Sequence, residues 1–150
     1  IDIVGAVHIA QHLAAMASEC GFAVRIIDPR SAFTDNRTFS NAEMINAWPD
    51  EFFQANTPDA TTAVVTLTHD PKLDDATLNS VLESSAFYIG CLGGKKTHAA
   101  RLKRLSECGH SQSSLDTIHG PVGLDINAAT PAEIAVSVLA EIIKTAHNKP

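Results

Sequence analysis

The sequence predicts an α/β fold of the Rossmann type, a doubly wound and mostly parallel sheet of about five strands with helices on both faces. Short runs rich in β-branched residues alternate with windows in which apolar residues recur every three or four positions. No internal repeat or low-complexity linker interrupts this alternation. Ligands of such sheets bind at the carboxyl ends of the strands, so the polar residues that follow each strand are the candidates for a site.

The first 28 residues read as one β-α-β unit. Residues 1–5 form the end of a strand, and Gly21 stops the helix that follows. Residues 22–27 are a second apolar run, closed by Asp28 and Pro29. The apolar positions with helical spacing in this unit are Ile9, Leu13, Met16 and Ala17.

The middle of the chain is less regular. Residues 29–61 are polar and weakly periodic, and we expect one short helix there over residues 42–47, with an apolar side made by Met44, Ala47 and Trp48. Residues 62–67 read as a buried strand, and residues 74–82 as a helix.

The second half repeats the pattern of strand, loop and helix. Residues 86–91 predict a strand, residues 97–108 a helix and residues 115–119 a short strand. The last helix is the best specified, because a capping hydroxyl, a proline at the first helical position and a glutamate three residues after the cap occur together. These residues are Thr130, Pro131 and Glu133, and the apolar face that should meet the sheet is Ile134, Val138, Leu139 and Ile142.

Length and composition limit the possible functions. The 150 residues fit one domain, 1–150, and a net charge of −6 disfavours nonspecific binding to nucleic acid or to anionic membranes. No apolar run approaches the roughly 20 residues that span a bilayer. The three cysteines form no C-x-x-C pair, which argues against a disulfide framework or a structural zinc site. We therefore expect a cytoplasmic protein that acts on neither membranes nor nucleic acids.

The first candidate site is the turn that begins at Gly5. Its position between strand and helix is that of a G-x-G-x-x-G/A dinucleotide fingerprint, and Asp28 lies where a carboxylate bonds the ribose in such folds. Val7 replaces the second glycine, so its branched side chain would obstruct a standard NAD pose, although the helix N-terminus still favours an anion. His8 and His12 could share a face, but H-E-x-x-H is absent, so His8 is a candidate for ligand contact rather than for metal binding.

The second candidate site follows the strand at residues 62–67. Thr68, His69 and Asp70 could serve proton transfer or hold a hard cation. The structural alternative is a turn at Asp70, and we expect Asp74 and Asp75 to be helix caps.

The third candidate site is a glycine-rich turn that enters a basic helix. The spacing of its glycines is not that of a Walker A motif, but backbone N–H groups and the helix dipole could still cradle a phosphate there. The alternative is a solvated basic face. The residues that we assign to this site are Gly90, Cys91, Gly93, Gly94, Lys95, Lys96, Thr97 and Arg101.

Cys91 and the segment 119–127 flank this turn. We expect the nearby lysines and helix N-terminus to lower the pKa of Cys91, which would make it a candidate for a persulfide or a metal thiolate; the alternative is a simply buried thiol. Segment 119–127 holds two glycines and a proline, so we predict a shaped loop that brings Gly123 to the same crevice.

The order of these motifs resembles the C-terminal domain of the XdhC/CoxI family, accessory proteins of xanthine dehydrogenase and related molybdenum hydroxylases. The matching motifs cover nearly the whole chain. They are Thr68-His69-Asp70, Tyr88-Ile89-Gly90, Thr97-His98-Ala99, Pro121-Val122-Gly123-Leu124-Asp125-Ile126 and the helix from Thr130, together with Gly5-Ala6 and Asp28-Pro29-Arg30. Two positions depart from the family pattern, Val7 in the first turn and Gly94 where the family has serine.

The resemblance implies a Rossmann-like domain that usually follows an N-terminal domain, which we expect to be missing from this chain. It implies binding of molybdenum cofactor (molybdopterin), its protection while a cysteine desulfurase supplies the terminal sulfur, and its insertion into a xanthine dehydrogenase-type molybdenum hydroxylase. A homodimer is a further expectation. No nucleophile, base and oxyanion site can be identified together, so we expect a chaperone rather than an enzyme.

Two alternatives stay open from the residues alone. The β-α-β unit and Asp28 are typical of an NAD(P)-dependent oxidoreductase, with NAD preferred because a carboxylate repels a 2′-phosphate. A domain that only engages protein partners is the other alternative, and exposed apolar surface would be its sign.

Overall fold

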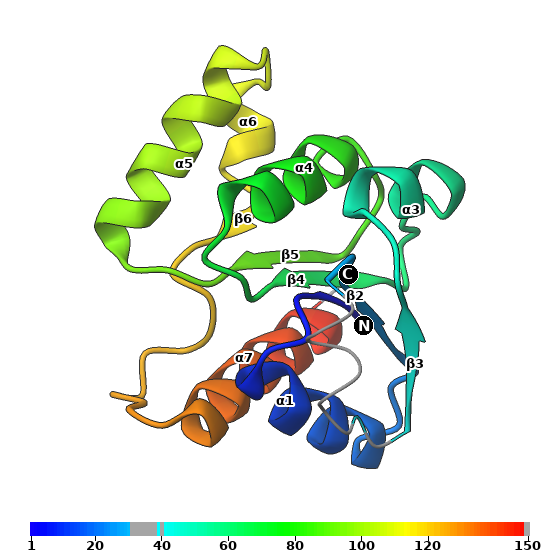
Figure 1. Cartoon of the computed structure of the whole chain (residues 1–150). Coiled ribbons are helices and arrows are strands. Elements are labelled where there is room, and N and C mark those ends of the chain that lie inside the picture. Colours follow the sequence, from blue (N-terminus) through cyan, green and yellow to red (C-terminus); the bar gives the residue numbers. More distant parts are fainter. Residues whose placement is uncertain (31–38, 40, 149–150) are drawn as a thin grey trace.

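The computed structural model describes residues 1–30, 39 and 41–148. Six parallel strands form one sheet in the order β3-β2-β1-β4-β5-β6 (Figure 1). The order of the strands along the chain reverses between β1 and β4. This is the strand order of a Rossmann fold and confirms the predicted fold class, with one strand more than expected. The strands are β1 (Asp2–Val4), β2 (Val24–Ile27), β3 (Ala42–Ile45), β4 (Ala63–Thr66), β5 (Tyr88–Cys91) and β6 (Ile118–His119).

Helices cover both faces of the sheet (Figure 1). Helices α1 and α7 pack against each other on one face, and α3 and α4 do so on the other, with α5 beside α4. The inward residues of each strand alternate between the two faces: Ile3 meets the α1 and α7 layer, and Val4 meets the α3 and α4 layer. The helices are α1 (His8–Glu19), α3 (Pro49–Ala55), α4 (Pro71–Val81), α5 (Lys95–Glu107), α6 (Gln112–Leu115) and α7 (Pro131–His147).

The predicted helix at residues 42–47 is wrong. Residues Ala42–Ile45 form the edge strand β3, which pairs in parallel with β2, and the helix of this region is α3. The apolar residues at 44, 47 and 48 have helical spacing, but backbone pairing with β2 overrides it. The signal for α3 was present in the sequence, because Pro49 stands at the first helical position and Asp50 and Glu51 follow it. Much of the polar stretch before β3 lies outside the described residues.

The boundaries of three other elements also differ from the prediction. Helix α4 begins at Pro71 rather than at residue 74, and α5 begins at Lys95 rather than at residue 97. The segment 115–119 is the end of α6 followed by the two-residue strand β6. The cap of α7 is confirmed, because Thr130 accepts from the N–H of Glu133 and the Glu133 carboxylate accepts from the N–H of Thr130. Among the described residues, no helix is both long and apolar enough to cross a membrane.

Candidate functional site

A pocket of about 530 Å³ lies at the carboxyl edge of the sheet, between the turn from β5 to α5 and the loop from β6 to α7. Its walls are mostly apolar side chains and glycine backbone, a composition common in sites for small organic ligands. The residues that the sequence analysis assigned to a site and that line this pocket are His69, Gly93, Gly94, Lys95 and Gly123. The other lining residues are Leu92, Pro121, Val122, Leu124, Asp125, Ile126, Asn127, Ala128, Ile134 and Ser137.

The turn before α5 is shaped for close approach to its backbone. Gly93 has φ +135°, and a Cβ there would come within 3.0 Å of Thr97 Cγ2, so a larger residue would be strained and crowded. Gly94 is the N-cap of α5 and offers no side chain to the first N–H groups of the helix. These N–H groups and the positive end of the helix dipole therefore favour an anion at the pocket.

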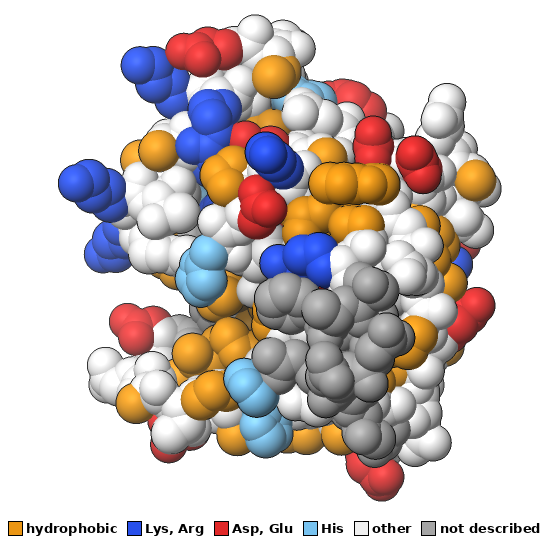
Figure 2. Space-filling view, in the orientation of Figure 1, with side chains coloured by type: hydrophobic (Ala, Val, Ile, Leu, Met, Phe, Trp, Pro, Cys, Tyr) orange, Lys and Arg blue, Asp and Glu red, His pale blue; other side chains and the backbone are white. Residues whose placement is uncertain are grey.

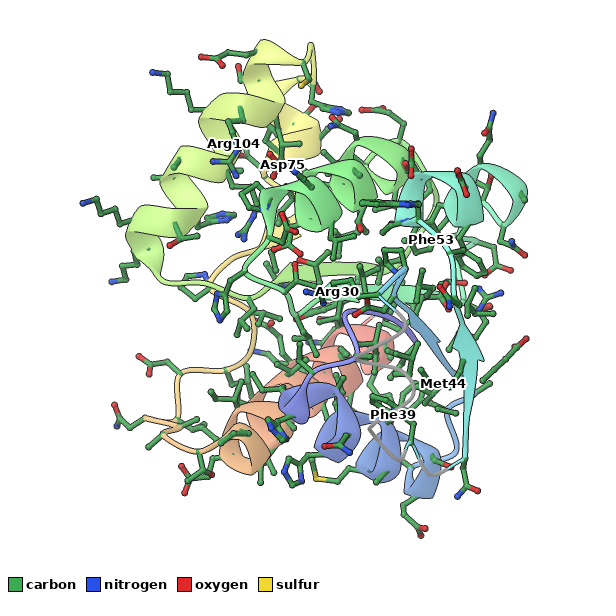
Figure 3. All side chains as sticks on the ribbon, in the orientation of Figure 1. Arg30, Phe39, Met44, Phe53, Asp75 and Arg104 are labelled. Carbon is green, nitrogen blue, oxygen red and sulfur yellow. The ribbon has the colours of Figure 1, made fainter. Side chains whose placement is uncertain are left out.

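Lysine and arginine side chains gather over α5 (Figure 2). Five of the 11 lysines and arginines of the chain lie between residues 95 and 104. Lys95 and Lys96 are both exposed, and Lys95 lines the pocket. Arg104 turns away from the pocket and forms an ion pair with Asp75 of α4, at 2.6 Å between Nε and Oδ2 (Figure 3).

Arg101 does not belong to the exposed patch, contrary to the sequence-based grouping with Lys95 and Lys96. Its side chain is only 3% exposed, and its NH2 group donates to the carbonyl of Leu92 at 2.9 Å. The guanidinium lies 3.6 Å from the carboxylate of Asp74, which is equally buried. Because it holds the carbonyl of Leu92 inward, Arg101 fixes the entry to the Gly93 turn.

Asp74 is not a helix cap, and neither is Asp75; the cap of α4 is Asp70, which accepts from the N–H of Lys72 at 2.9 Å. Asp74 instead accepts from the hydroxyl of Thr68 at 2.6 Å. Burial raises the pKa of Asp74 to about 6, and the bond from Thr68 and the charge of Arg101 offset only part of this rise. Thr68 thus joins a buried polar cluster below the sheet edge.

Cys91 is fully buried at the end of β5. Burial raises the pKa of its thiol to about 12, and the charge of Arg101 opposes this only in part. The expectation of a lowered pKa is therefore wrong, because desolvation of the thiolate outweighs the nearby positive charges. Gly90 lies in the same strand, where a Cβ would meet Tyr88 and Val122 at 2.7 Å. The glycine is therefore explained by close packing inside the protein rather than by contact with a ligand.

The opposite wall of the pocket depends on residues that were not assigned to a site from the sequence. Glu141 of α7 accepts from the N–H of Gly123 at 2.9 Å and from the hydroxyl of Tyr88 at 2.6 Å. The ring of His119 stacks on Tyr88, with 4.4 Å between centroids. His98 packs so closely on Gly120 that a Cβ at Gly120 would overlap its ring. A buried tyrosine hydroxyl requires a hydrogen-bond partner. The tyrosine in the strand at residues 86–91 was therefore the signal in the sequence that a polar partner such as Glu141 lies beside it.

A second pocket, of about 480 Å³, lies where the strand order reverses between β1 and β4; we call it the switch-point pocket. It is lined by Val7, Arg30, Leu67, Thr68, His69, Asp70 and Pro71. The exposed His69 therefore lies between the two pockets and borders both. His8 is exposed in the first turn of α1. In the part of the chain that the structure describes, no three His, Cys, Asp or Glu side chains group as metal ligands would.

Asp28, which the sequence analysis assigned to ribose binding, is completely buried and already engaged. It accepts from the N–H of Ala6 and from both the backbone and the side chain of Arg30, with all distances at 2.8–2.9 Å. Gly5 has φ +109°, and a Cβ there would lie 2.6 Å from Thr68 Cγ2. Close packing onto the segment that follows β4 thus explains the glycine at residue 5.

Comparison with known proteins identifies the family. The model of the XdhC Rossmann domain matches residues 1–142. The chain belongs to the XdhC Rossmann domain family. A crystal structure described as a xanthine dehydrogenase from Bacillus halodurans has a TM-score of 0.83 and 30% identity, and the match covers 99% of this chain and 43% of that one.

Curated relatives of this XdhC domain come from two bacteria. A protein of Bacillus subtilis, named as a probable xanthine dehydrogenase subunit, is 37% identical over 89% of this chain and 38% of its own length. The molybdenum cofactor insertion chaperone PaoD of Escherichia coli is 39% identical over 56% of this chain and 26% of its own length. The chain thus spans about a quarter to two fifths of the curated relatives that it matches.

The structure places most of the predicted site residues of this XdhC domain in three settings, and His8, Lys96 and Thr97 are exposed outside them. One group lines the pocket between the β5–α5 turn and the β6–α7 loop, and a second group borders the switch-point pocket. A third group is buried below these pockets. It consists of Gly5, Asp28, Gly90, Cys91 and Arg101. Lys96 and Thr97 are exposed in the first turn of α5 beside the first pocket.

Proposed function

We propose that this domain binds molybdenum cofactor and serves its insertion into a molybdenum hydroxylase of the xanthine dehydrogenase type. The observation that carries the proposal is the pocket between the β5–α5 turn and the β6–α7 loop. It combines an uncapped helix N-terminus, a lysine and apolar walls in one cavity. The names of the relatives agree with this role, since one is a molybdenum cofactor insertion chaperone.

The phosphate of the cofactor binds at the Gly93-Gly94 turn. The first N–H groups of α5 lack a capping side chain, and the ammonium of Lys95 lies on the same rim. Lys96 is exposed one residue further and adds to the positive potential. Since the whole chain carries a net charge of −6, this local positive charge selects where an anionic ligand binds.

The ring system of the cofactor lies against the apolar wall of the same pocket. Leu92 lines it from the β5–α5 turn, Val122 and Ile126 from the β6–α7 loop, and Ile134 from α7. A planar heterocycle buries apolar faces and hydrogen-bonds at its edges. The N–H groups of Val122, Gly123 and Leu124 already donate within the protein, so backbone groups of the lining residues 125–128 are the candidates for such bonds. His69 is exposed and lines both this pocket and the switch-point pocket.

The partners follow from this role. A carrier must release its cargo to a client, and we propose a molybdenum hydroxylase as that client. Sulfur donation by a cysteine desulfurase and association of the domain with a second copy of itself belong to the same proposal and rest on the family resemblance. The domain acts as a carrier in this scheme, and the client performs the redox chemistry.

The test is anaerobic equilibrium binding of molybdenum cofactor to the chain and to a Lys95→Ala/Lys96→Ala double variant. Lys103→Ala is the matched control, because Lys103 is exposed on the same helix two turns from the glycine turn. We expect the double variant to bind at least tenfold more weakly and the control to bind like the unaltered chain. Equal binding by all three proteins, or no binding by any, would contradict the proposed site.

A further inference from the structure

The hydrogen-bonding capacity of Asp28 is used up within the protein. Oδ1 accepts from the backbone N–H and the Nε–H of Arg30, both at 2.9 Å. Oδ2 accepts from the N–H of Ala6 and from NH2 of Arg30, both at 2.8 Å. An ionised carboxylate has about four lone-pair sites, so four donors saturate it.

The same position in a nucleotide-binding Rossmann domain needs an open carboxylate. There the acidic residue at the end of the second strand accepts from the hydroxyls of the adenosine ribose. In this chain the planar fork of Arg30 makes two parallel bonds to Asp28, which occupies both oxygens as a vicinal diol would. The Asp28 side chain is fully buried, so no face of the carboxylate is left for a ligand.

We propose that Arg30 is a specificity-determining residue that closes the ribose subsite of the fold, so that the domain rejects NAD(P) and other ligands recognised by a ribose diol. Val7 acts with it. Its side chain lines the switch-point pocket at the place of the second fingerprint glycine, where a pyrophosphate would approach the backbone. Arg30 and Val7 together keep cellular dinucleotides from binding beside the pocket that, under the proposed function, holds molybdenum cofactor.

The geometry argues for this role over simple stabilisation of the sheet. Another bidentate pair joins β2 to β1 near their amino ends, where Arg25 binds Asp2 with both distances at 2.7 Å, whereas Asp28 and Arg30 both follow β2. That pair already ties β2 to β1, and it lies away from the ligand edge. Arg30 is placed differently, because it lines the switch-point pocket and follows β2 at the carboxyl edge of the sheet (Figure 3).

The test is restoration of dinucleotide binding. Val7→Gly recreates a G-x-G-x-x-A turn over residues 5–10, and Arg30→Ala frees two acceptors on Asp28. Calorimetry with ADP-ribose compares the unaltered chain, Val7→Gly, the Val7→Gly/Arg30→Ala variant and the triple variant that adds Asp28→Asn. Arg25→Ala is the matched control, since it removes an equivalent ion pair outside the pocket.

We expect the double variant to bind ADP-ribose at least tenfold more tightly than either the unaltered chain or Arg25→Ala. Most of this gain should vanish in the triple variant and with an analogue that lacks the 2′-hydroxyl of the adenosine ribose. A double variant that unfolds cooperatively but shows no gain would overturn the proposal.

A second measurement needs no variant. If the unaltered chain binds ADP-ribose no better than the 2′-deoxy analogue, or binds neither at millimolar concentration, Asp28 is closed as proposed. A clear preference of the unaltered chain for the ribose form would show that Asp28 is open to ligands and would overturn the proposal. Arg30→Met, which keeps an apolar stem of similar length, replaces Arg30→Ala if that variant does not fold.

Discussion

The carboxylate of Glu141 lies 2.9 Å from the backbone nitrogen of Gly123, a contact that ties the middle of α7 to the loop that walls the pocket. Gly123 has φ +93°, and a Cβ there would lie 2.4 Å from Ser137 Oγ, so the loop approaches α7 as closely as a backbone can. The same carboxylate accepts from the hydroxyl of Tyr88 in β5. One acidic side chain thus connects sheet, helix and pocket wall.

Replacement of Glu141 by alanine should loosen this wall. The variant loses two hydrogen bonds to a charged acceptor. A hydrogen bond of this kind stabilises a protein by about 1.5–3 kcal/mol. We expect faster hydrogen exchange over residues 120–128 and weaker binding of molybdenum cofactor, with the sheet amides unchanged. Glu107→Ala, which removes an exposed carboxylate at the end of α5, is the control. Unchanged exchange in the loop would mean that Glu141 does not hold it.

Asp74 should make stability depend on pH in the weakly acidic range. Its pKa is about 6 in the folded chain, against 3.8 as the ordinary value, so the folded state binds the proton more tightly than the unfolded state. The free energy of unfolding therefore falls as pH rises through the window between these two pKa values, by about 2 kcal/mol from this group between pH 4 and pH 6.

The measurement is urea unfolding of the unaltered chain and of Asp74→Asn at pH 4, 5, 6 and 7. Asparagine keeps an acceptor for the Thr68 hydroxyl but does not titrate. The unaltered chain should lose stability relative to the variant as pH rises through this range. A constant difference between the two proteins would refute the raised pKa.

A methyl group at residue 120 should distort the pocket. The added Cβ of Gly120→Ala would overlap the ring of His98, whereas a Cβ at Gly94 meets no atom within 4 Å. We therefore expect Gly120→Ala to lower the thermal midpoint by several degrees and to change the amide spectrum of residues 119–124. Gly94→Ala should fold like the unaltered chain. Equal stability of the two variants would show that α5 and the loop separate readily at this contact.

The three cysteines should differ in reactivity. Cys91 is fully buried with its pKa raised to about 12, whereas Cys20 and Cys108 are exposed. Since only the thiolate reacts with a disulfide reagent, two thiols per chain should react quickly at pH 8 and the third only after denaturation. Mass spectrometry of the labelled protein identifies the sites. Rapid labelling of Cys91 in the folded chain would contradict its burial.

Local signals in the sequence were sufficient for most of the fold. The capping pattern at Thr130 and Glu133 located α7, and runs of β-branched residues located β2 and β4. The edge strand β3 was mistaken for a helix because it is short and half exposed, and its pairing with β2 is not visible in its own residues.

The candidate site was predicted in part, for a physical reason. Glycine turns and polar residues after strands depend on local backbone, so Gly93 and His69 could be assigned to the edge of the sheet. The direction of a long side chain depends on tertiary packing. Arg101 therefore looked like a surface charge, and the link from Glu141 to Gly123 spans 18 residues without a local motif.

We propose that molybdenum cofactor binds between the β5–α5 turn and the β6–α7 loop. The most direct test is anaerobic titration of the ¹⁵N-labelled chain with the cofactor, followed by amide shifts. Binding at this pocket should give saturable shifts at Gly93, Gly94, Gly123 and Leu124, on both of its walls, and little change at Ala6 and Asp28. Shifts concentrated at Ala6 and Asp28 instead would place the ligand in the switch-point pocket and rule out the proposed site.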